Sequence, residues 1–234
     1  MSTVALNGGL NRAVAFYESV IGKKVVMAVT GFILFGFVLV HMLANLQVFI
    51  PVGPDGIPAL DKYAEHLRDL PPLLWGARAV LLASVILHVI AAWQLTVLNR
   101  FQARGSRYIK HTSIAANYAS RTMIWSGPII FFYIIYHIMD MTLGTVHPDF
   151  IPGKVFHNVV TGFQNPVVAG FYIVANILLA FHLYHGVWSM FQTLGVSHPR
   201  YTPLLKKASA VFAIVIGVGF CSVPIAVLTG LVKL

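Results

Sequence analysis

Long apolar runs separated by short polar segments dominate the pattern along the chain. A helix needs about 20 mostly apolar residues to cross a membrane, and five stretches meet this requirement. They run from about 25 to 49, 73 to 98, 123 to 143, 167 to 194 and 208 to 231. The runs lack two-residue alternation and are too long for barrel strands. We therefore predict an all-α integral membrane bundle of five transmembrane helices, forming a single domain over residues 1–234.

The composition agrees with a membrane protein and excludes other classes. Hydrophobic residues make up 58% of the chain and charged residues only 10%, whereas soluble domains carry about 25% charged residues. A water-soluble enzyme and a disordered chain are therefore not expected. The single cysteine, Cys221, rules out a disulfide scaffold and suits inert packing. In a membrane protein, the net charge of +9 is better explained by basic loops that set the orientation in the membrane. We therefore expect no nucleic-acid partner.

The charged residues predict how the bundle is oriented. One side would hold the N-terminus and the segments 99–122 and 195–207, with eleven Lys and Arg residues and Glu18 as the single acid. The other side would hold five Lys and Arg residues against six acids. Because positive charge accumulates in cytoplasmic loops, we expect a cytoplasmic N-terminus and an external C-terminus. The basic inner face suits anionic membrane lipid or an acidic partner protein.

Each of the first four predicted spans carries one deep histidine: His41, His88, His137 and His182. At about 1.5 Å per residue, His41 and His137 lie about 24–25 Å beyond the basic residues that begin their spans. They therefore belong to the outer half of the membrane. The spans of His88 and His182 run in the opposite direction, and the same arithmetic places both toward the inner half. The four side chains thus form two pairs at two depths.

Ionisable side chains at this depth are costly and by default mark a functional site. Two imidazoles that face each other across a bundle can hold one haem iron at both axial positions. We therefore predict two stacked haem b sites within the first four helices, one near each membrane face. Covalent c-type haem is excluded, because no Cys-x-x-Cys-His motif occurs.

Deep histidines can also serve roles that involve no haem. A single membrane histidine often serves packing or hydrogen bonding. Zinc is disfavoured, because two ligands at each level do not complete a tetrahedral site. A histidine proton relay would favour a continuous column with carboxylates.

Smaller groups near the histidines would complete the haem sites. Gly31 and Gly186 remove side-chain bulk where a helix or a flat porphyrin must approach, and ordinary packing between membrane helices accounts for them as well. Haem propionates need cationic or hydroxyl partners at the membrane face. The candidates for the inner haem are Lys23, Lys24, Ser120 and Arg121. The cations among them also serve to set the topology.

The segments around the four histidines resemble a known family. They are Leu39–Asn45, Leu87–Val89, Tyr136–Ile138 and Phe181–Trp188. Together they resemble the ligand-bearing helices of the diheme cytochrome b membrane anchor of B-type succinate:quinone oxidoreductases and the related fumarate reductases. The resemblance covers nearly the whole chain, including the segment 165–174 and Ser120–Arg121 before Gly127. Its best single motif, His182 with Gly186 and Trp188, implies that the ligand is His182 rather than His185.

The resemblance implies a role in the respiratory chain. In this family a flavoprotein subunit with covalent FAD oxidises succinate, a step of the tricarboxylic acid cycle, and an iron–sulfur subunit passes the electrons to the anchor. Two haems b then carry them toward quinone, often menaquinone. The resemblance implies that His88 and His182 ligate the inner haem, and His41 and His137 the outer haem, in the cytoplasmic membrane of a bacterium. The sequence does not decide whether several copies of the complex assemble into a higher oligomer.

The quinone site is expected at one of two places. Polar residues cluster on the outer side, near the expected outer haem, although a solvated loop would account for them as well. They are Asp61, Tyr63, Glu65 and His66. Inner candidates are Ser19, Lys23, Lys24 and Trp125. Asp140, one turn beyond His137, is a further candidate for proton handling on the outer side.

Related and unrelated functions predict different sequence features. Some fumarate reductases of the family carry a glutamate two residues before the fourth-helix ligand, and Ala180 occupies that position here, which favours succinate oxidation. A quinone-cycling cytochrome b would place two ligands on each of two helices, and hydrogenase or formate dehydrogenase anchors form another alternative. A transporter or assembly protein would show membrane carboxylates, broken helices or an inverted repeat. The loops are too short for a catalytic domain, so succinate chemistry would need soluble partner subunits.

Overall fold

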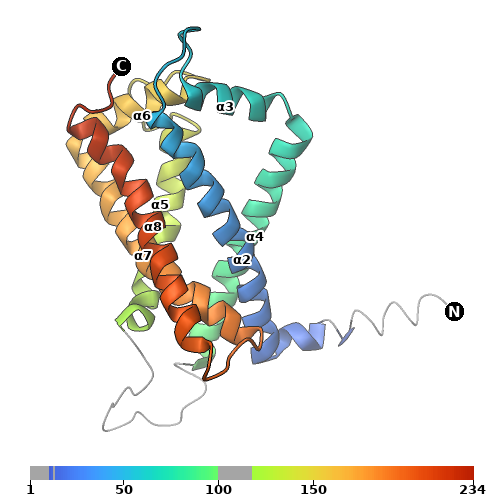
Figure 1. Cartoon of the computed structure of the whole chain (residues 1–234). Helices are drawn as coiled ribbons and strands as arrows, with labels where there is room; N and C mark the ends of the chain where they lie inside the picture. Colours follow the sequence, from blue (N-terminus) through green and yellow to red (C-terminus); the bar gives the residue numbers. More distant parts are fainter. Residues whose placement is uncertain (1–10, 13, 100–117) are drawn as a thin grey trace, which may run out of the picture.

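The computed structural model describes residues 11, 12, 14–99 and 118–234, with side chains in the last range from Met123 onward (Figure 1). Every secondary-structure element in the described residues is a helix, and these residues contain no strand. Five helices are long and apolar enough to span a membrane. They are α2 (Val20–Asn45), α4 (Pro71–Val97), α5 (Tyr118–Met141), α7 (Pro166–Thr193) and α8 (Thr202–Leu228). The predicted all-α protein with five membrane-spanning helices is confirmed.

Local sequence signals explain where these helices begin and end. The Ser19 hydroxyl caps α2 by accepting the backbone N–H of Gly22 at 2.9 Å. Asn165 caps α7 in the same way, accepting from Val167 at 2.9 Å, and Pro166 follows in the first helical position. A short 3₁₀ turn, η1 (Leu46–Phe49), extends α2.

Most of the surface of the spans faces outward. In the most apolar window of each span, only 11% to 33% of the residues are buried inside the protein. Large side chains such as Phe132, Val167 and Leu204 are exposed on the helices. In water this exposure would be unfavourable, so it agrees with helices whose outer faces contact lipid.

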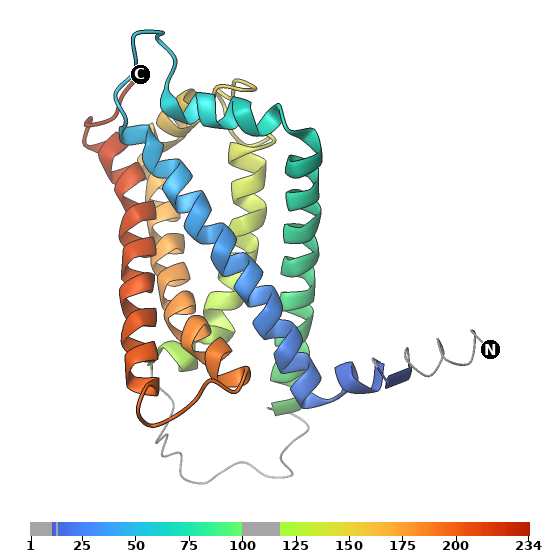
Figure 2. The same ribbon diagram turned by 45° about the vertical axis from the view of Figure 1, so that its right-hand side comes forward.

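Two short helices occupy regions that the hydropathy pattern predicts as loops. They are α3 (Ala59–Arg68) and α6 (Val155–Gln164), and they place His66 and His157 on helices. Both lie across the end of the bundle that also holds the C-terminus (Figures 1 and 2); we call it the α3/α6 end. With ten residues each, they are too short to span a membrane, so long apolar runs do not reveal them.

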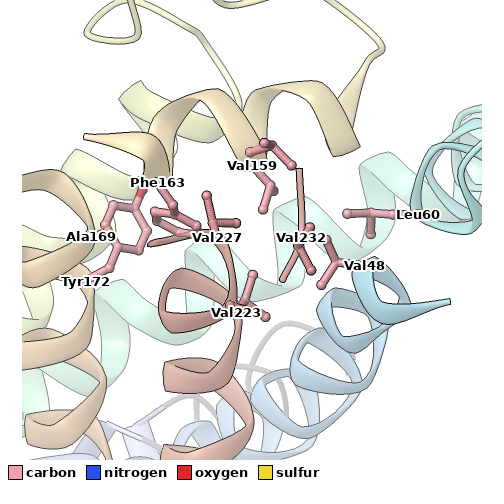
Figure 3. Close-up of a cluster of buried hydrophobic side chains, with 11 residues drawn as sticks. Val48, Leu60, Val159, Phe163, Ala169, Tyr172, Val223, Val227 and Val232 are labelled. Atoms are coloured by element: carbon pink, nitrogen blue, oxygen red, sulfur yellow. The ribbon is translucent and has the colours of Figure 1, made fainter. Parts of the chain in front are cut away.

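The side chains under these helices form a compact core (Figure 3). Val159 and Phe163 of α6 meet Tyr172 of α7 and Val227 of α8. Val48 of η1 and Leu60 of α3 belong to the same cluster. This core ties the short helices to the ends of the spans and fixes the α3/α6 end.

The contacts among the four histidine-bearing helices run in the order α4–α2–α7–α5. Helix α2 packs against α4 and α7, and α7 packs against α5; α8 lies mainly against α7. Helix α2 runs obliquely across the other helices (Figure 2). The backbones of α2 and α5, and those of α4 and α7, make little direct contact among the described residues. The same holds for the backbones of α4 and α5 among the described residues.

Candidate functional site

The structure brings the four deep histidines together as two pairs, each of which joins two helices whose backbones make little direct contact. The rings of His41 on α2 and His137 on α5 lie 5.8 Å apart between centroids, with an angle of 77° between their planes. The rings of His88 on α4 and His182 on α7 lie 6.4 Å apart at 58°. These are the pairs that the depth argument predicts.

The two pairs lie at different heights in the bundle. His41 and His137 each precede the last residue of their helix by four positions, so they lie near the α3/α6 end. His88 and His182 each lie more than halfway along a helix that starts at that end. The two pairs are therefore stacked along the bundle.

The ring separations fit a metal held between two imidazoles. A metal bonded at about 2 Å to one nitrogen of each ring keeps the ring centres roughly 6 Å apart. In the part of the chain that the structure describes, no three His, Cys, Asp or Glu side chains gather in a way that could hold a metal ion. Two axial imidazoles suffice for haem, whereas structural zinc needs four ligands. Each pair therefore suits haem better than zinc.

Hydroxyl groups bind the Nδ1 atoms of three of these rings. Thr30 Oγ1 lies 3.1 Å from His88 Nδ1, Ser126 Oγ lies 3.4 Å from His182 Nδ1, and the Tyr172 hydroxyl lies 3.4 Å from His137 Nδ1. Such contacts orient the ring and leave Nε2 for a metal. The sequence does not point to these three hydroxyl residues, because they lie on other helices and no spacing rule connects them to the histidines.

The fourth histidine has aromatic rather than polar neighbours. Phe37 stacks on the His41 ring at 5.2 Å and 15°. Phe220 of α8 lies 5.9 Å from the same ring at a tilt of 44°. The ring is thus held by packing between α2 and α8, and α8 contributes to the site although it carries no histidine.

Two buried polar atoms near His182 have no hydrogen-bond partner among the described residues. They are Nδ1 of His185 and Nε1 of Trp188, whose rings meet edge to face at 5.7 Å. The Lys206 ammonium lies over the Trp188 ring at 4.6 Å. The indole N–H of Trp188 only donates, and a buried donor without a partner is costly.

The predicted glycines occupy different surroundings. A Cβ atom at Gly31 would lie 3.4 Å from Cε1 of His88, so this glycine makes room for the His88 ring. A Cβ atom at Gly186 would meet no atom within 4 Å, which leaves space on that face of α7. Gly31 is thus tied to a histidine directly, whereas Gly186 borders open space.

The candidate propionate partners are only partly described. Lys24 is exposed, and the Lys23 ammonium donates to the carbonyls of Tyr17 and Glu18 at 3.1 and 2.6 Å. Lys23 therefore serves the fold at the start of α2. The side chains of Ser120 and Arg121 lie outside the described residues.

The four residues of the predicted outer patch lie on α3 and differ in burial and in hydrogen bonding. Asp61 is buried and accepts the backbone N–H of Phe156 in the first turn of α6 at 2.8 Å. This contact caps α6 and joins it to α3. Tyr63 is half-buried, and Glu65 and His66 are exposed. The four residues share a helix, but Asp61 already has a structural role.

Asp140 lies in a buried polar cluster. Its carboxylate is 2.8 Å from His147 Nδ1 and accepts the Tyr172 hydroxyl at 2.7 Å. A cavity of about 170 Å³ lies against Asp140, His147 and Thr161 and reaches the exposed residues Pro148 and Asp149. The sequence points to Asp140 as a candidate, whereas it gives no sign of the roles of His147 and Tyr172.

Comparisons of the chain with protein-family models, with curated proteins and with solved structures found no match.

Proposed function

We propose that this chain is the cytochrome b membrane anchor of a succinate:quinone oxidoreductase, with two haems b held by His41–His137 and His88–His182. The observation that carries the proposal is the meeting of four deep histidines from four helices in two pairs, with ring centroids 5.8 and 6.4 Å apart. Haems bound there would supply one-electron carriers between an iron–sulfur cluster and quinone. Bis-histidine ligation leaves no open iron position, which suits electron transfer rather than oxygen binding.

The contacts around the pairs support this use. Thr30, Ser126 and Tyr172 lie at hydrogen-bond distance from Nδ1 of their histidines, so these residues orient the rings and select the tautomer. Helices α2 and α5, like α4 and α7, make little direct backbone contact although their histidine rings meet, which leaves room for a wide group between them. The unpartnered indole N–H of Trp188 favours a ligand with acceptor oxygens.

The partners and the location follow from the resemblance and the charge pattern. A flavoprotein subunit with FAD and an iron–sulfur subunit would dock on the basic side, which we assign to the cytoplasm by the positive-inside rule. The pair His88–His182 would then lie closer to the iron–sulfur subunit. The membrane would be the cytoplasmic membrane of a bacterium, and the electron acceptor menaquinone.

The proposed quinone site lies at the α3/α6 end. The exposed Glu65 and His66, with Tyr63, lie on α3 at the end nearer His41–His137. Asp140 borders a cavity of about 170 Å³ that is large enough for several waters, which supports proton handling by Asp140. Unchanged quinone reduction after joint substitution of Glu65 and Asp61 would exclude the patch on α3.

The decisive experiment is optical spectroscopy of the purified chain and of membranes that contain it. A dithionite-reduced minus oxidised spectrum should show b-type bands at about two haems per polypeptide. Succinate should reduce the same bands in membranes, with the partner subunits present. Absence of b-type bands would reject the proposal, and haems that succinate cannot reduce would favour another diheme cytochrome b.

A further inference from the structure

A chain of hydrogen bonds connects the α3/α6 end of the bundle with one ligand candidate. Thr161 Oγ1 lies 3.0 Å from His147 Nε2, and His147 Nδ1 lies 2.8 Å from Asp140 Oδ1. The Tyr172 hydroxyl donates to Asp140 Oδ2 at 2.7 Å and lies 3.4 Å from His137 Nδ1. We call these five residues the Asp140 network. It links α6, the loop after α5, α5 itself and α7.

The direction of the bonds next to His137 is fixed by the carboxylate. An ionised carboxylate only accepts, so the single hydrogen of the Tyr172 hydroxyl points to Asp140. The Tyr172 oxygen therefore accepts from Nδ1–H of His137. The proton on Nδ1 leaves Nε2 of His137 as the nitrogen available to a metal.

The other end of the network places a second donor on Asp140. Nδ1 of His147 lies 2.8 Å from Asp140 Oδ1, and a ring nitrogen beside a carboxylate donates to it, so Nδ1 carries a hydrogen. Nε2 of the same ring lies 3.0 Å from Thr161 Oγ1, whose hydroxyl also lies 2.9 Å from the carbonyl of His157. Asp140 thus accepts from both His147 and Tyr172.

The network is buried and closely packed. The side chains of His147 and Asp140 are only 2% and 3% exposed. Gly162 of α6 faces the His147 ring, and a Cβ atom there would lie 2.8 Å from Cε1 of that ring. A carboxylate in such a place carries a desolvation cost that its donors must offset, so the cluster is weak evidence for a purely stabilising role.

We propose that the Asp140 network positions His137 and lowers the reduction potential of the haem held by His41 and His137. This inference rests on the proposed function. Tyr172 passes the effect of the Asp140 charge to His137, because a hydrogen bond to a group that is itself bonded to an anion raises the basicity of an imidazole. A more basic ligand and a nearby negative charge both favour the oxidised iron, which carries one more positive charge.

The test is a potentiometric titration of the purified haem-loaded chain, followed by absorption. Asp140→Asn keeps the shape and removes the charge, and Tyr172→Phe removes only the link. Each should raise the potential of one haem and leave the other unchanged. The double variant should shift the potential by little more than Asp140→Asn alone, because that change already removes both the charge and the path through Tyr172. His147→Gln weakens one of the two donors to Asp140, which leaves more of the carboxylate's negative charge facing Tyr172, and should shift the same haem to lower potential.

Tyr136→Phe is the matched control. Tyr136 precedes His137, and its ring meets that of Tyr172 at 6.1 Å, but its hydroxyl is outside the network. This variant should keep both potentials. The haem of His88–His182 reports folding in every sample. Unchanged potentials in Asp140→Asn and Tyr172→Phe with full haem content would overturn the inference, as would a shift of His147→Gln in the same direction as Asp140→Asn. Absence of haem from the unaltered chain would instead reject the proposed function.

Discussion

His88 Nδ1 lies 3.1 Å from the hydroxyl oxygen of Thr30, so a side chain of α2 orients a histidine of α4. The Thr30 hydroxyl also lies 2.7 Å from the carbonyl of Val26, to which it donates. Its oxygen is then an acceptor, and Nδ1 of His88 must carry the proton. The contact with Thr30 fixes the tautomer with the proton on Nδ1. Nε2 of His88 is then unprotonated and available to a metal.

Replacing Thr30 by valine should therefore weaken the His88–His182 site specifically. Loss of an outer partner of a metal-binding histidine typically lowers affinity or activity about 10- to 100-fold. We expect faster haem loss from this site on dilution, measured by transfer of haem to an excess of an apo-globin. Thr96→Val is the control, because Thr96 on α4 also donates to a carbonyl one turn earlier, at 2.8 Å, and contacts no histidine among the described residues. Equal haem loss from both variants would contradict the assigned role.

Bulk at Gly31 should displace His88. A Cβ atom there would already lie 3.4 Å from Cε1 of the ring, and the two further methyl groups of valine extend toward it. Gly31→Val should lose the haem of His88–His182 and retain that of His41–His137, as judged by haem content and reduced spectra. Gly36→Val on the same helix is the matched control, because a Cβ atom at Gly36 meets nothing within 4 Å. A Gly31→Val variant with both haems intact would show that this contact is dispensable.

The Asp61 carboxylate should contribute to the unfolding free energy of the chain. It caps α6 through Phe156 at 2.8 Å, and loss of such a cap costs about 1 kcal/mol of unfolding free energy. Asp61→Ala should lower the thermal unfolding temperature in detergent without changing the haem spectrum. Glu65→Ala, an exposed change on the same helix, should have little effect. If Asp61→Ala unfolds like the unaltered chain but reduces quinone poorly, Asp61 belongs to the quinone site instead.

The Asp55–Lys62 ion pair predicts a local pH dependence. The hydrogen bond from the Lys62 ammonium, aided by the Ile57 backbone N–H, lowers the pKa of Asp55 below its ordinary value. A lowered folded-state pKa means that the pair supports the loop above the ordinary Asp pKa and that this support is lost as pH falls through the lowered value. Carbon-detected NMR of labelled aspartate should show the pKa of Asp55 rising in Lys62→Met. An unchanged titration would contradict the pairing. Because both groups are exposed, the effect on global stability should be small.

The five spans could be predicted from the sequence because membrane crossing requires long apolar runs, and the observed ends differ from the predicted ones by a few residues. The sequence indicates helix α6 only weakly, because its apolar residues recur at helical spacing over only ten residues. They are Val155, Val159, Val160 and Phe163. The pairing of histidines followed from depth alone. Their hydroxyl partners could not be predicted, because contacts such as Tyr172 with His137 depend on the rotation of each helix about its axis, which hydropathy does not determine.

The most direct test of the two bis-histidine sites is the haem-to-chain ratio of four single alanine variants. His41→Ala and His137→Ala should each lose the same haem, and His88→Ala and His182→Ala should each lose the other. The two members of a pair should leave the same residual spectrum and the same remaining potential. Retention of both haems in any one variant, or loss of different haems by His41→Ala and His137→Ala, would contradict the assignment of these sites.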